Sequence, residues 1–196
     1  MDKRAQKQAM AFVEAMDLGY DDYKEVVAGL LTRVDPYKGL GTPLYMAVCG
    51  HSWNVYLESV ALRRTSRIGV VEVFMTKRDE SDPDWQGYWH VPGTALRYGD
   101  TEESAWARLA REYGVPILSR THVGDAGIGW FKKGDTGRGP GISLIHVTKL
   151  EGEPMLNERR GWFNVNDLPD PTVPLHINPI IPRAVSAYQS PDRRGY

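Results

Sequence analysis

The chain has 196 residues, of which 41% are hydrophobic and 25% are charged, so it can bury a core and is not a disordered chain. Its 24 basic and 25 acidic side chains give a net charge of −1, which argues against a surface coated in positive charge for duplex nucleic acid. The single cysteine excludes an internal disulfide and a cysteine-rich zinc site. No apolar run reaches the roughly 20 residues of a membrane span, and the N-terminus lacks the apolar core of a signal peptide. We therefore expect a soluble, cytoplasmic protein with neither a membrane nor a nucleic-acid partner.

The first forty residues are predicted to form two helices. In the second helix, apolar residues recur at i, i+3, i+4, i+7 and i+8 and share one face: Tyr23, Val26, Val27, Leu30 and Leu31. Asp21 or Asp22 can cap this helix, and the pair Asp35-Pro36 ends it. A weaker stripe indicates an earlier helix over residues 2–16. Residues 1–40 are thus expected to form a helical extension, which packs on the main domain or forms a homodimer with a second copy; the sequence does not choose.

From residue 44 onward the pattern is that of strands. Segments rich in branched and aromatic residues predict strands over 44–48, 55–62, 68–77, 122–123, 128–131, 142–150 and 162–165. The glycine-rich stretch 132–141 is expected to be a flexible turn, and residues 190–196 a flexible tail. Asn178-Pro179 is expected to start a last helix, which runs to about Tyr188. Strands that dominate the middle, with few helices between them, indicate the α+β class.

The segment 87–115 contains one clear helix, expected over residues 101–113. Asp100 can cap its start, and Glu103, three residues further on, completes a pair that resembles a capping box. Gly114 is well placed to end the helix in a left-handed conformation. The spacing assigns the buried face to Ala105, Trp106, Leu109, Ala110 and Tyr113, and the opposite side to Ser104, Arg108, Arg111 and Glu112.

This loop–helix–loop resembles the Nudix box, whose pattern is Gly, five residues, Glu, seven residues, then Arg-Glu-U-x-Glu-Glu-x-Gly-U, with U aliphatic. The preceding segment 88–93 (YWHVPG) and the pair Lys77-Arg78 are similar to the residues that lead into the box, and 161–169 (GWFNVNDLP) is similar to the strand and Leu-Pro before the last helix. The resemblance implies a Nudix-like α/β/α sandwich around a mixed sheet over residues 41–189. It also implies hydrolysis of nucleoside diphosphates linked to another moiety, with Mg²⁺ or Mn²⁺ held by the glutamates.

The chain departs from the Nudix box at its acidic positions. Aligned without gaps, the first Glu position holds Gly99, and the three later acidic positions hold Arg108, Arg111 and Glu112. If one residue is deleted, Asp100 matches the first Glu, and again only one of the three later positions stays acidic. A guanidinium about 4 Å from a cation repels each unit of its charge by about 4 kcal/mol at an effective dielectric of 20. We therefore do not expect a metal to bind here in the family's usual arrangement.

Two functional hypotheses follow from the resemblance and this departure. The first is a divergent pyrophosphohydrolase in which Glu112 is the surviving metal ligand and catalytic residue, assisted by Asp100, Glu102 or Glu103, with Mg²⁺ or Mn²⁺ as cofactor. The second is a catalytically inactive domain that binds a nucleotide, another diphosphate-containing small molecule or a protein partner without metal.

Arginine side chains are the candidate ligand-binding groups of the second hypothesis. A guanidinium binds phosphate in a bidentate way without metal, and the candidates are Arg78, Arg97, Arg108 and Arg111. The simpler interpretation is a solvated helix face, in which an arginine contacts Glu112 or Glu103 one turn away. A further alternative assigns function to the N-terminal helices and leaves the Nudix-like part as a scaffold.

Overall fold

The computed structural model describes residues 19–34, 54–67, 69–82, 85–128 and 141–190, together with residues 7, 11, 44 and 48. The chain divides into two compact units, Met1–Val48 and Cys49–Tyr196. Among the described residues, no helix combines the length and the apolar character needed to cross a membrane.

The first unit contains helix α2 (Tyr20–Leu31), as the apolar stripe predicts. Its N-cap is Gly19, which makes no side-chain cap, so the predicted capping by Asp21 or Asp22 is wrong. Both carboxylates lie instead in the first turn, where negative charge is favourable to the helix dipole. The apolar stripe of α2 is exposed, and the homodimer through the N-terminal helices stays a prediction.

Two other predictions for the N-terminal part fall largely outside the described residues. In the predicted helix 2–16, Lys7 and Ala11 are described, and both are helical. In the predicted strand 44–48, Leu44 and Val48 are described, and both are helical, so the strand prediction is wrong at these two positions. Branched and aromatic residues favour strands only weakly, and helical context overrides this preference.

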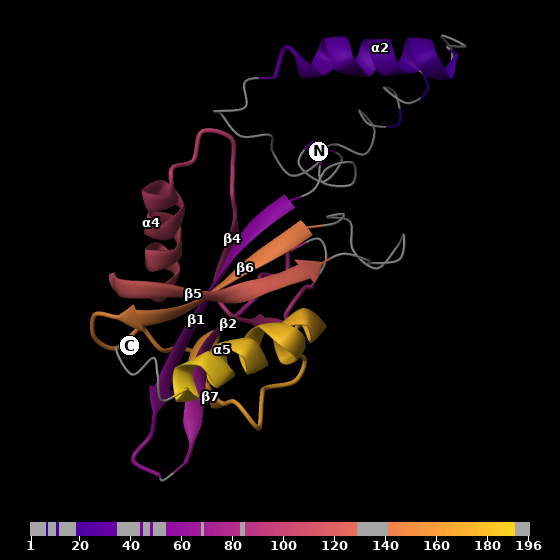
Figure 1. The fold of residues 1–196 in the computed structure, drawn as a ribbon. Coiled ribbons are helices and arrows are strands. Elements are labelled where there is room, and N and C mark those ends of the chain that lie inside the picture. Colours follow the sequence, from indigo (N-terminus) through magenta and orange to yellow (C-terminus); the bar gives the residue numbers. More distant parts are fainter. Residues whose placement is uncertain are drawn as a thin grey trace. The chain divides into compact units, whose positions relative to one another are not determined.

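The second unit is built on a mixed sheet, which has seven strands in the described residues (Figure 1). The strands are β1 (Asn54–Arg64), β2 (Val71–Lys77), β3 (Trp89–His90), β4 (Gly93–Ala95), β5 (Ile117–Ile128), β6 (Gly141–Leu150) and β7 (Arg160–Asn164). Their order is β3-β2-β1-β6-β5, with β4 also paired to β1 and β7 to β2. β1 and β6 are parallel, and the other pairs are antiparallel. The predicted α+β class is confirmed.

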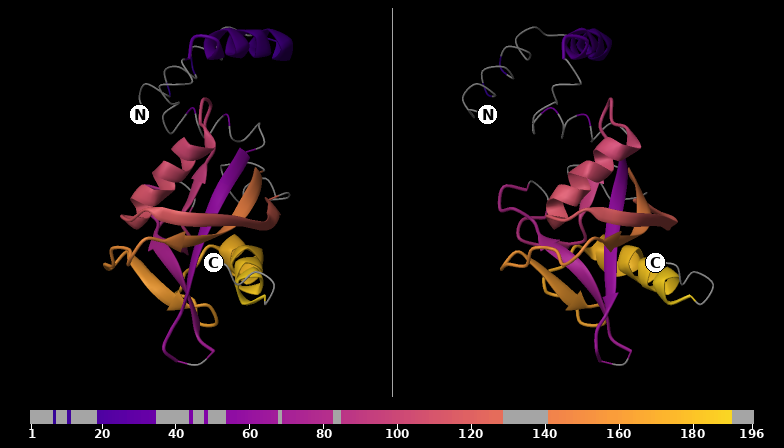
Figure 2. Two further views of the ribbon diagram at one scale, coloured as in Figure 1. Left: turned by 60° about the vertical axis from the view of Figure 1, so that its left-hand side comes forward. Right: turned by 90° about the vertical axis from the view of Figure 1, so that its left-hand side faces the viewer.

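Helices cover both faces of this sheet (Figure 2). Alternate residues of β1 point to opposite faces, so Leu57 packs with α4 (Glu102–Tyr113), whereas Val60 and Leu62 join the core beside α5 (Ile181–Gln189). This gives the predicted α/β/α sandwich. Its two apolar cores lie on either side of β1, which fixes the position of the central strand.

Some predicted boundaries are wrong. The separate strands predicted over 122–123 and 128–131 belong, in their described part, to the single strand β5, whose pairing with β6 shifts register at Ile117/Ser119 and at His122/Gly124. The last helix α5 has Ile180 as its N-cap, because the preceding helical turn is interrupted at Asn178, which has extended φ and ψ of −155° and 119°. Of the expected turn 132–141, only Gly141 is described, and it begins β6, so the turn prediction is wrong there; of the expected tail 190–196, only Ser190 is described.

Candidate functional site

The helix of the box region, α4, is capped as its sequence allows, but by other residues than predicted. The N-cap is Thr101, whose hydroxyl accepts from the backbone N–H of Ser104 at 3.2 Å, while the Thr101 N–H donates to the Ser104 hydroxyl at 3.0 Å. The expected pair Asp100 and Glu103 is therefore displaced by one residue. Gly114 ends the helix in the left-handed region (φ 75°), as predicted.

The C-terminal end of α4 is fixed to the sheet by a buried tyrosine. The buried face of the helix is as expected except that Ala110 is only half-buried: Ala105, Trp106, Leu109 and Tyr113. The Tyr113 hydroxyl donates to the carbonyl oxygen of Ser59 in β1 at 2.8 Å. This bond holds the last turn of the helix, and with it Glu112, against the sheet.

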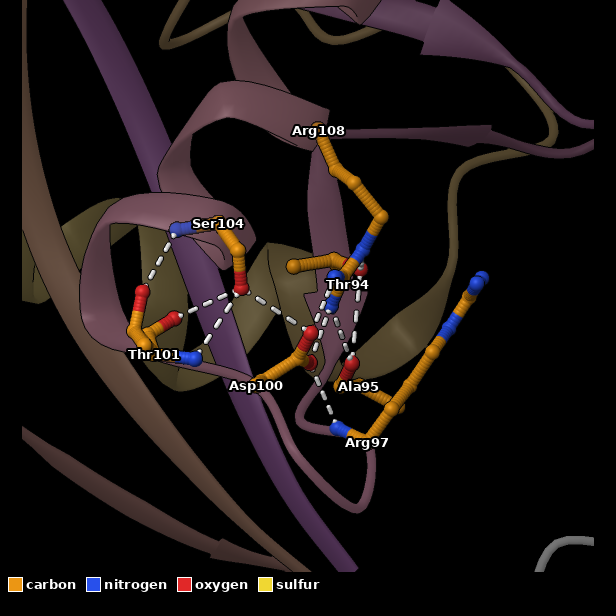
Figure 3. A network of polar contacts seen from close by, with 7 residues as sticks. All are labelled: Thr94, Ala95, Arg97, Asp100, Thr101, Ser104 and Arg108. Carbon is orange, nitrogen blue, oxygen red and sulfur yellow. Dashed lines mark hydrogen bonds and ion pairs between the residues drawn. The ribbon is translucent and has the colours of Figure 1, made fainter. Parts of the chain in front are cut away.

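Asp100 and Arg108 form a bidentate ion pair at the start of α4 (Figure 3). Both guanidinium–carboxylate distances are 2.6 Å, and the two side chains are only 12% and 17% exposed. Arg108 also donates to the carbonyl oxygen of Ala95 at 3.1 Å and to the Thr94 hydroxyl at 3.3 Å. The backbone N–H of Arg97 donates to Asp100 at 2.7 Å, while its side chain points away from the carboxylate (Figure 3). The pair joins the helix to the loop before it.

This pairing accounts for the electrostatics of both residues. The hydrogen bonds from Arg108 hold the pKa of Asp100 well below its usual range, and those to Asp100 raise the pKa of Arg108. Asp100 therefore holds no proton to donate near neutral pH. The charge of Arg108 is compensated by its partner, so the expected repulsion of a cation by Arg108 is weaker than the sequence indicates.

Glu103 and Arg111 lie on the exposed side of α4. Glu103 is in the first turn, where hydrogen bonds to its own backbone N–H and to Thr101 lower its pKa. Arg111 is in the last turn, where a positive charge is favourable to the helix dipole. Arg111 is thus solvated, as the simpler interpretation of the helix face expects, but that interpretation is wrong for Arg108, which is only 17% exposed and pairs with Asp100 rather than with Glu112 or Glu103.

A polar cavity of about 520 Å³ lies where several elements of the second unit meet. It is lined by residues from the end of β2 and the loop after it, from β3 and β4, from the end of α4, from the turn before β7 and from the start of β7: Thr76, Lys77, Arg78, Asp79, Asp82, His90, Gly93, Glu112, Asn157, Arg159 and Arg160. Of the sequence-predicted site residues, the structure places Glu112 and Arg78 in this lining. Asp100, Glu103, Arg97, Arg108 and Arg111 are not part of it.

The cavity's cationic side is made of three guanidinium groups. Arg78 pairs with Asp82 at 2.7 Å, and its buried Nε has no hydrogen-bond partner in the described residues. Arg159 donates to the carbonyl oxygen of Arg78 at 2.9 Å and lies 3.5 Å from Asp79. The Arg160 side chain makes no hydrogen bond or ion pair within the part of the chain that the structure describes. Arg160 is therefore the lining guanidinium most available to a ligand; the fourth cationic lining residue, Lys77, has its Nζ 5.9 Å from the centroid of the Trp89 ring.

Glu112 lines the same cavity and provides a charge of the opposite sign. Burial raises its pKa to about 7, against the lowering effect of the positive charges of Arg160 and Arg78. Among the described residues its carboxylate accepts no hydrogen bond and makes no ion pair at close range. A carboxyl group with this pKa is divided between its acid and carboxylate forms at neutral pH.

A second carboxyl group, Glu58 of β1, lies behind the cavity wall and is only 6% exposed. Burial raises its pKa to about 7. Two groups oppose this rise: the Ser143 hydroxyl, which donates a hydrogen bond to the carboxyl at 2.9 Å, and the positive charge of Arg78. The negative charge of Glu112 adds to the rise. This carboxyl lies beside Gly93 of the lining, its cross-strand partner in β4. A Cβ at position 93 would lie 2.5 Å from Oε2 of Glu58, so the close approach requires glycine.

No family model matches the chain, and neither does any curated protein. Among solved structures, a Nudix hydrolase from Nitrosomonas europaea is 14% identical, with a TM-score of 0.51 over 69% of this chain and 90% of the other. NrtR from Shewanella oneidensis is 16% identical, with a TM-score of 0.52 over 67% of this chain and 61% of the other. A chain of the complex between the C-terminal domain of mouse MUTYH and human PCNA is 14% identical, with a TM-score of 0.52 over 69% and 89%.

The chain has the Nudix fold. The likeness in architecture agrees with the resemblance carried by the box region, so the predicted sandwich around a mixed sheet is confirmed.

The residues present do not fit the metal site that a Nudix box implies. In the described ranges, no group of three His, Cys, Asp or Glu side chains is placed to hold a metal ion. Two of the three later acidic positions of the box hold arginines, Arg108 and Arg111. Two of the carboxylates that line the cavity, Asp79 and Asp82, lie beside arginines. Both other carboxylates of the cavity lining thus have an arginine partner, so neither is available to bind a metal ion together with Glu112.

Sequence reasoning missed three residues that shape this Nudix-fold cavity. Glu58 is the one acidic residue within the otherwise largely apolar segment 55–62, and such an isolated charge in a buried strand is a usable signal. Arg159 and Arg160 stand side by side just before the predicted strand 162–165, so a basic pair at a strand end was also visible. Neither signal indicates which other elements lie nearby.

Proposed function

We propose that this domain binds a diphosphate-containing small molecule, of the nucleoside diphosphate class, in the cavity without a metal ion. The observation that carries the proposal is Arg160, a cavity-lining guanidinium with no hydrogen bond or ion pair among the described residues. A guanidinium presents paired donors that match two phosphate oxygens, and charge-assisted bonds of this kind are the strong ones.

The neighbouring arginines support the same conclusion. Arg159 and Arg78 are held in place by Asp79 and Asp82 and line the same cavity, so a phosphate there meets fixed positive groups. The cavity volume of about 520 Å³ falls within the range of roughly 300–1,000 Å³ that is common for small-molecule sites. The absence of a suitable carboxylate trio in the described residues favours binding through guanidinium groups over binding through a bound cation.

Metal-dependent hydrolysis is the second candidate, with Mg²⁺ or Mn²⁺ as cofactor. The observation that favours it is Glu112, which lines the cavity and has a pKa of about 7, in the range suited to a general base. The two candidates make opposite predictions for this residue. Removing its negative charge strengthens metal-free binding of an anion, but it removes the ligand that a metal would need.

The test is a calorimetric titration of the full chain with inorganic pyrophosphate and with ADP-ribose, first in EDTA and then with Mg²⁺ or Mn²⁺. We expect binding in EDTA, a loss of about tenfold or more in Arg160→Gln, and unchanged or tighter binding in Glu112→Gln. Arg97→Gln is the matched control, since this exposed arginine lies outside the cavity lining, and it should bind like the wild type.

The same samples are assayed for cleavage of ADP-ribose. Binding that requires a divalent cation, together with cleavage that is lost in Glu112→Gln, would overturn the metal-free proposal in favour of hydrolysis. Binding that is absent under every condition would reject both candidates.

A further inference from the structure

The cavity carries both signs of charge on side chains from different elements, which we call the arginine wall and the acidic wall. Arg159 comes from the turn before β7 and Arg160 is the first residue of β7, whereas Glu112 comes from the last turn of α4. The other lining carboxylates, Asp79 and Asp82, already lie next to arginines. Glu112 is the lining carboxylate, in the described residues, that has no arginine within ion-pair distance.

Glu58 adds a second negative group behind the same wall. Its Oε2 lies 2.5 Å from the position that a Cβ of residue 93 would take, so the carboxyl occupies the side-chain space next to the lining residue Gly93. Arg78 is the cation that acts on both Glu58 and Glu112, and it is already paired with Asp82. Arg160 also attracts Glu112, but among the described residues neither Glu58 nor Glu112 has a cation within ion-pair distance.

A purely anionic ligand matches only half of such a cavity. Its phosphate would take up the positive charge of Arg160, which otherwise attracts Glu112, and the partly buried Glu112 carboxylate would then face the rest of the ligand with less compensation. A ligand that carries a positive nitrogen as well as a phosphate would match both walls, because its phosphate would face the arginines and its nitrogen would face Glu112.

We propose that the ligand is a phosphate or diphosphate ester of a positively charged amine, with the phosphate on Arg160 and the cationic nitrogen on Glu112. This inference rests on the proposed function, because it assumes that the arginine wall holds the phosphate. It narrows the ligand class from diphosphates in general to those with a primary or quaternary ammonium group or a cationic heterocycle.

The experiment compares two small probes that differ in the ammonium group, O-phosphoethanolamine and ethyl phosphate. Dissociation constants are measured by NMR titration of the full chain in EDTA, for the wild type, Glu112→Gln and the control Glu151→Gln, an exposed residue outside the cavity lining. We expect phosphoethanolamine to bind about tenfold more tightly than ethyl phosphate in the wild type and in Glu151→Gln. In Glu112→Gln the ratio should fall to near one, because phosphoethanolamine binds more weakly while ethyl phosphate binds as well or better.

The outcomes separate this inference from the proposed function. If ethyl phosphate binds and phosphoethanolamine binds no more tightly, the ammonium proposal is overturned and phosphate binding stands. If neither probe binds the wild type, the phosphate site itself is rejected, and the inference with it. If Mg²⁺ tightens ethyl phosphate binding and Glu112→Gln abolishes that gain, Glu112 is a metal ligand and the ammonium proposal is wrong.

Discussion

Replacing Glu58 by Gln should stabilise the second unit, and more so at alkaline pH. The carboxyl is 6% exposed, and burial raises its pKa from 4.5 to about 7. Glutamine has the same shape, and its amide oxygen can still accept the hydrogen bond that Ser143 donates at 2.9 Å. The substitution therefore removes the ionisation of a buried group and changes the packing little.

The sign follows from proton binding in the two states. Between pH 4.5 and pH 7 the folded protein keeps the proton on Glu58, whereas the unfolded chain has lost it, so the free energy of unfolding falls as the pH rises through this window. A difference of 2.5 pKa units corresponds to about 3 kcal/mol, because one unit is worth 1.36 kcal/mol. Glu58→Gln should recover up to this amount at pH 8 and almost none of it at pH 4.5.

Urea denaturation of the wild type and Glu58→Gln at pH 4.5, 6 and 8 measures this difference directly. Glu151→Gln is the control, since Glu151 is exposed, and its effect should not change across the series. The reasoning is refuted if Glu58→Gln is less stable than the wild type at pH 8. That result would mean that the ionised carboxylate, attracted by Arg78, stabilises the fold.

Two further substitutions test contacts near the site. Asp100→Asn should lower the free energy of unfolding by about 2 kcal/mol, because it removes the charged partner of the largely buried Arg108. Thermal denaturation measures this loss, and an unchanged melting temperature would mean that the ion pair does not stabilise the fold. Gly93→Ala should destabilise by about 2 kcal/mol, because its Cβ would lie 2.5 Å from Oε2 of Glu58. In a Glu58→Ala background the cost of Gly93→Ala should shrink, and additive effects in a double-mutant cycle would contradict the contact.

Local sequence patterns predict much of this fold because they follow from short-range physics. The helix α4 is predicted almost residue by residue, since its apolar spacing and the left-handed Gly114 act within the segment itself. Asn178 shows the limit. It has the chemistry of a helix cap, but the chain is extended there, and the last helix begins after Ile180.

The candidate site was less predictable because its members come from distant parts of the chain. Glu112 and Arg78 were both selected from the resemblance to the Nudix box and its preceding strand. Glu58 and Arg160 become their neighbours through the pairing of β1 with β2 and β4 and of β2 with β7. Spacing along the sequence carries no information on such pairings. The spacing also did not predict that Arg108 forms an ion pair with Asp100, which compensates its charge.

The register shifts in β5 have a consequence for how the protein behaves in concentrated solution. In the described residues β5 is the outermost strand next to β6, and a twelve-residue edge would offer a long row of free backbone groups to another chain. The two shifts, at Ile117/Ser119 and His122/Gly124, bend and interrupt that row. A strand of another chain could form backbone hydrogen bonds with only short stretches of this edge, so the register shifts disfavour edge-to-edge aggregation.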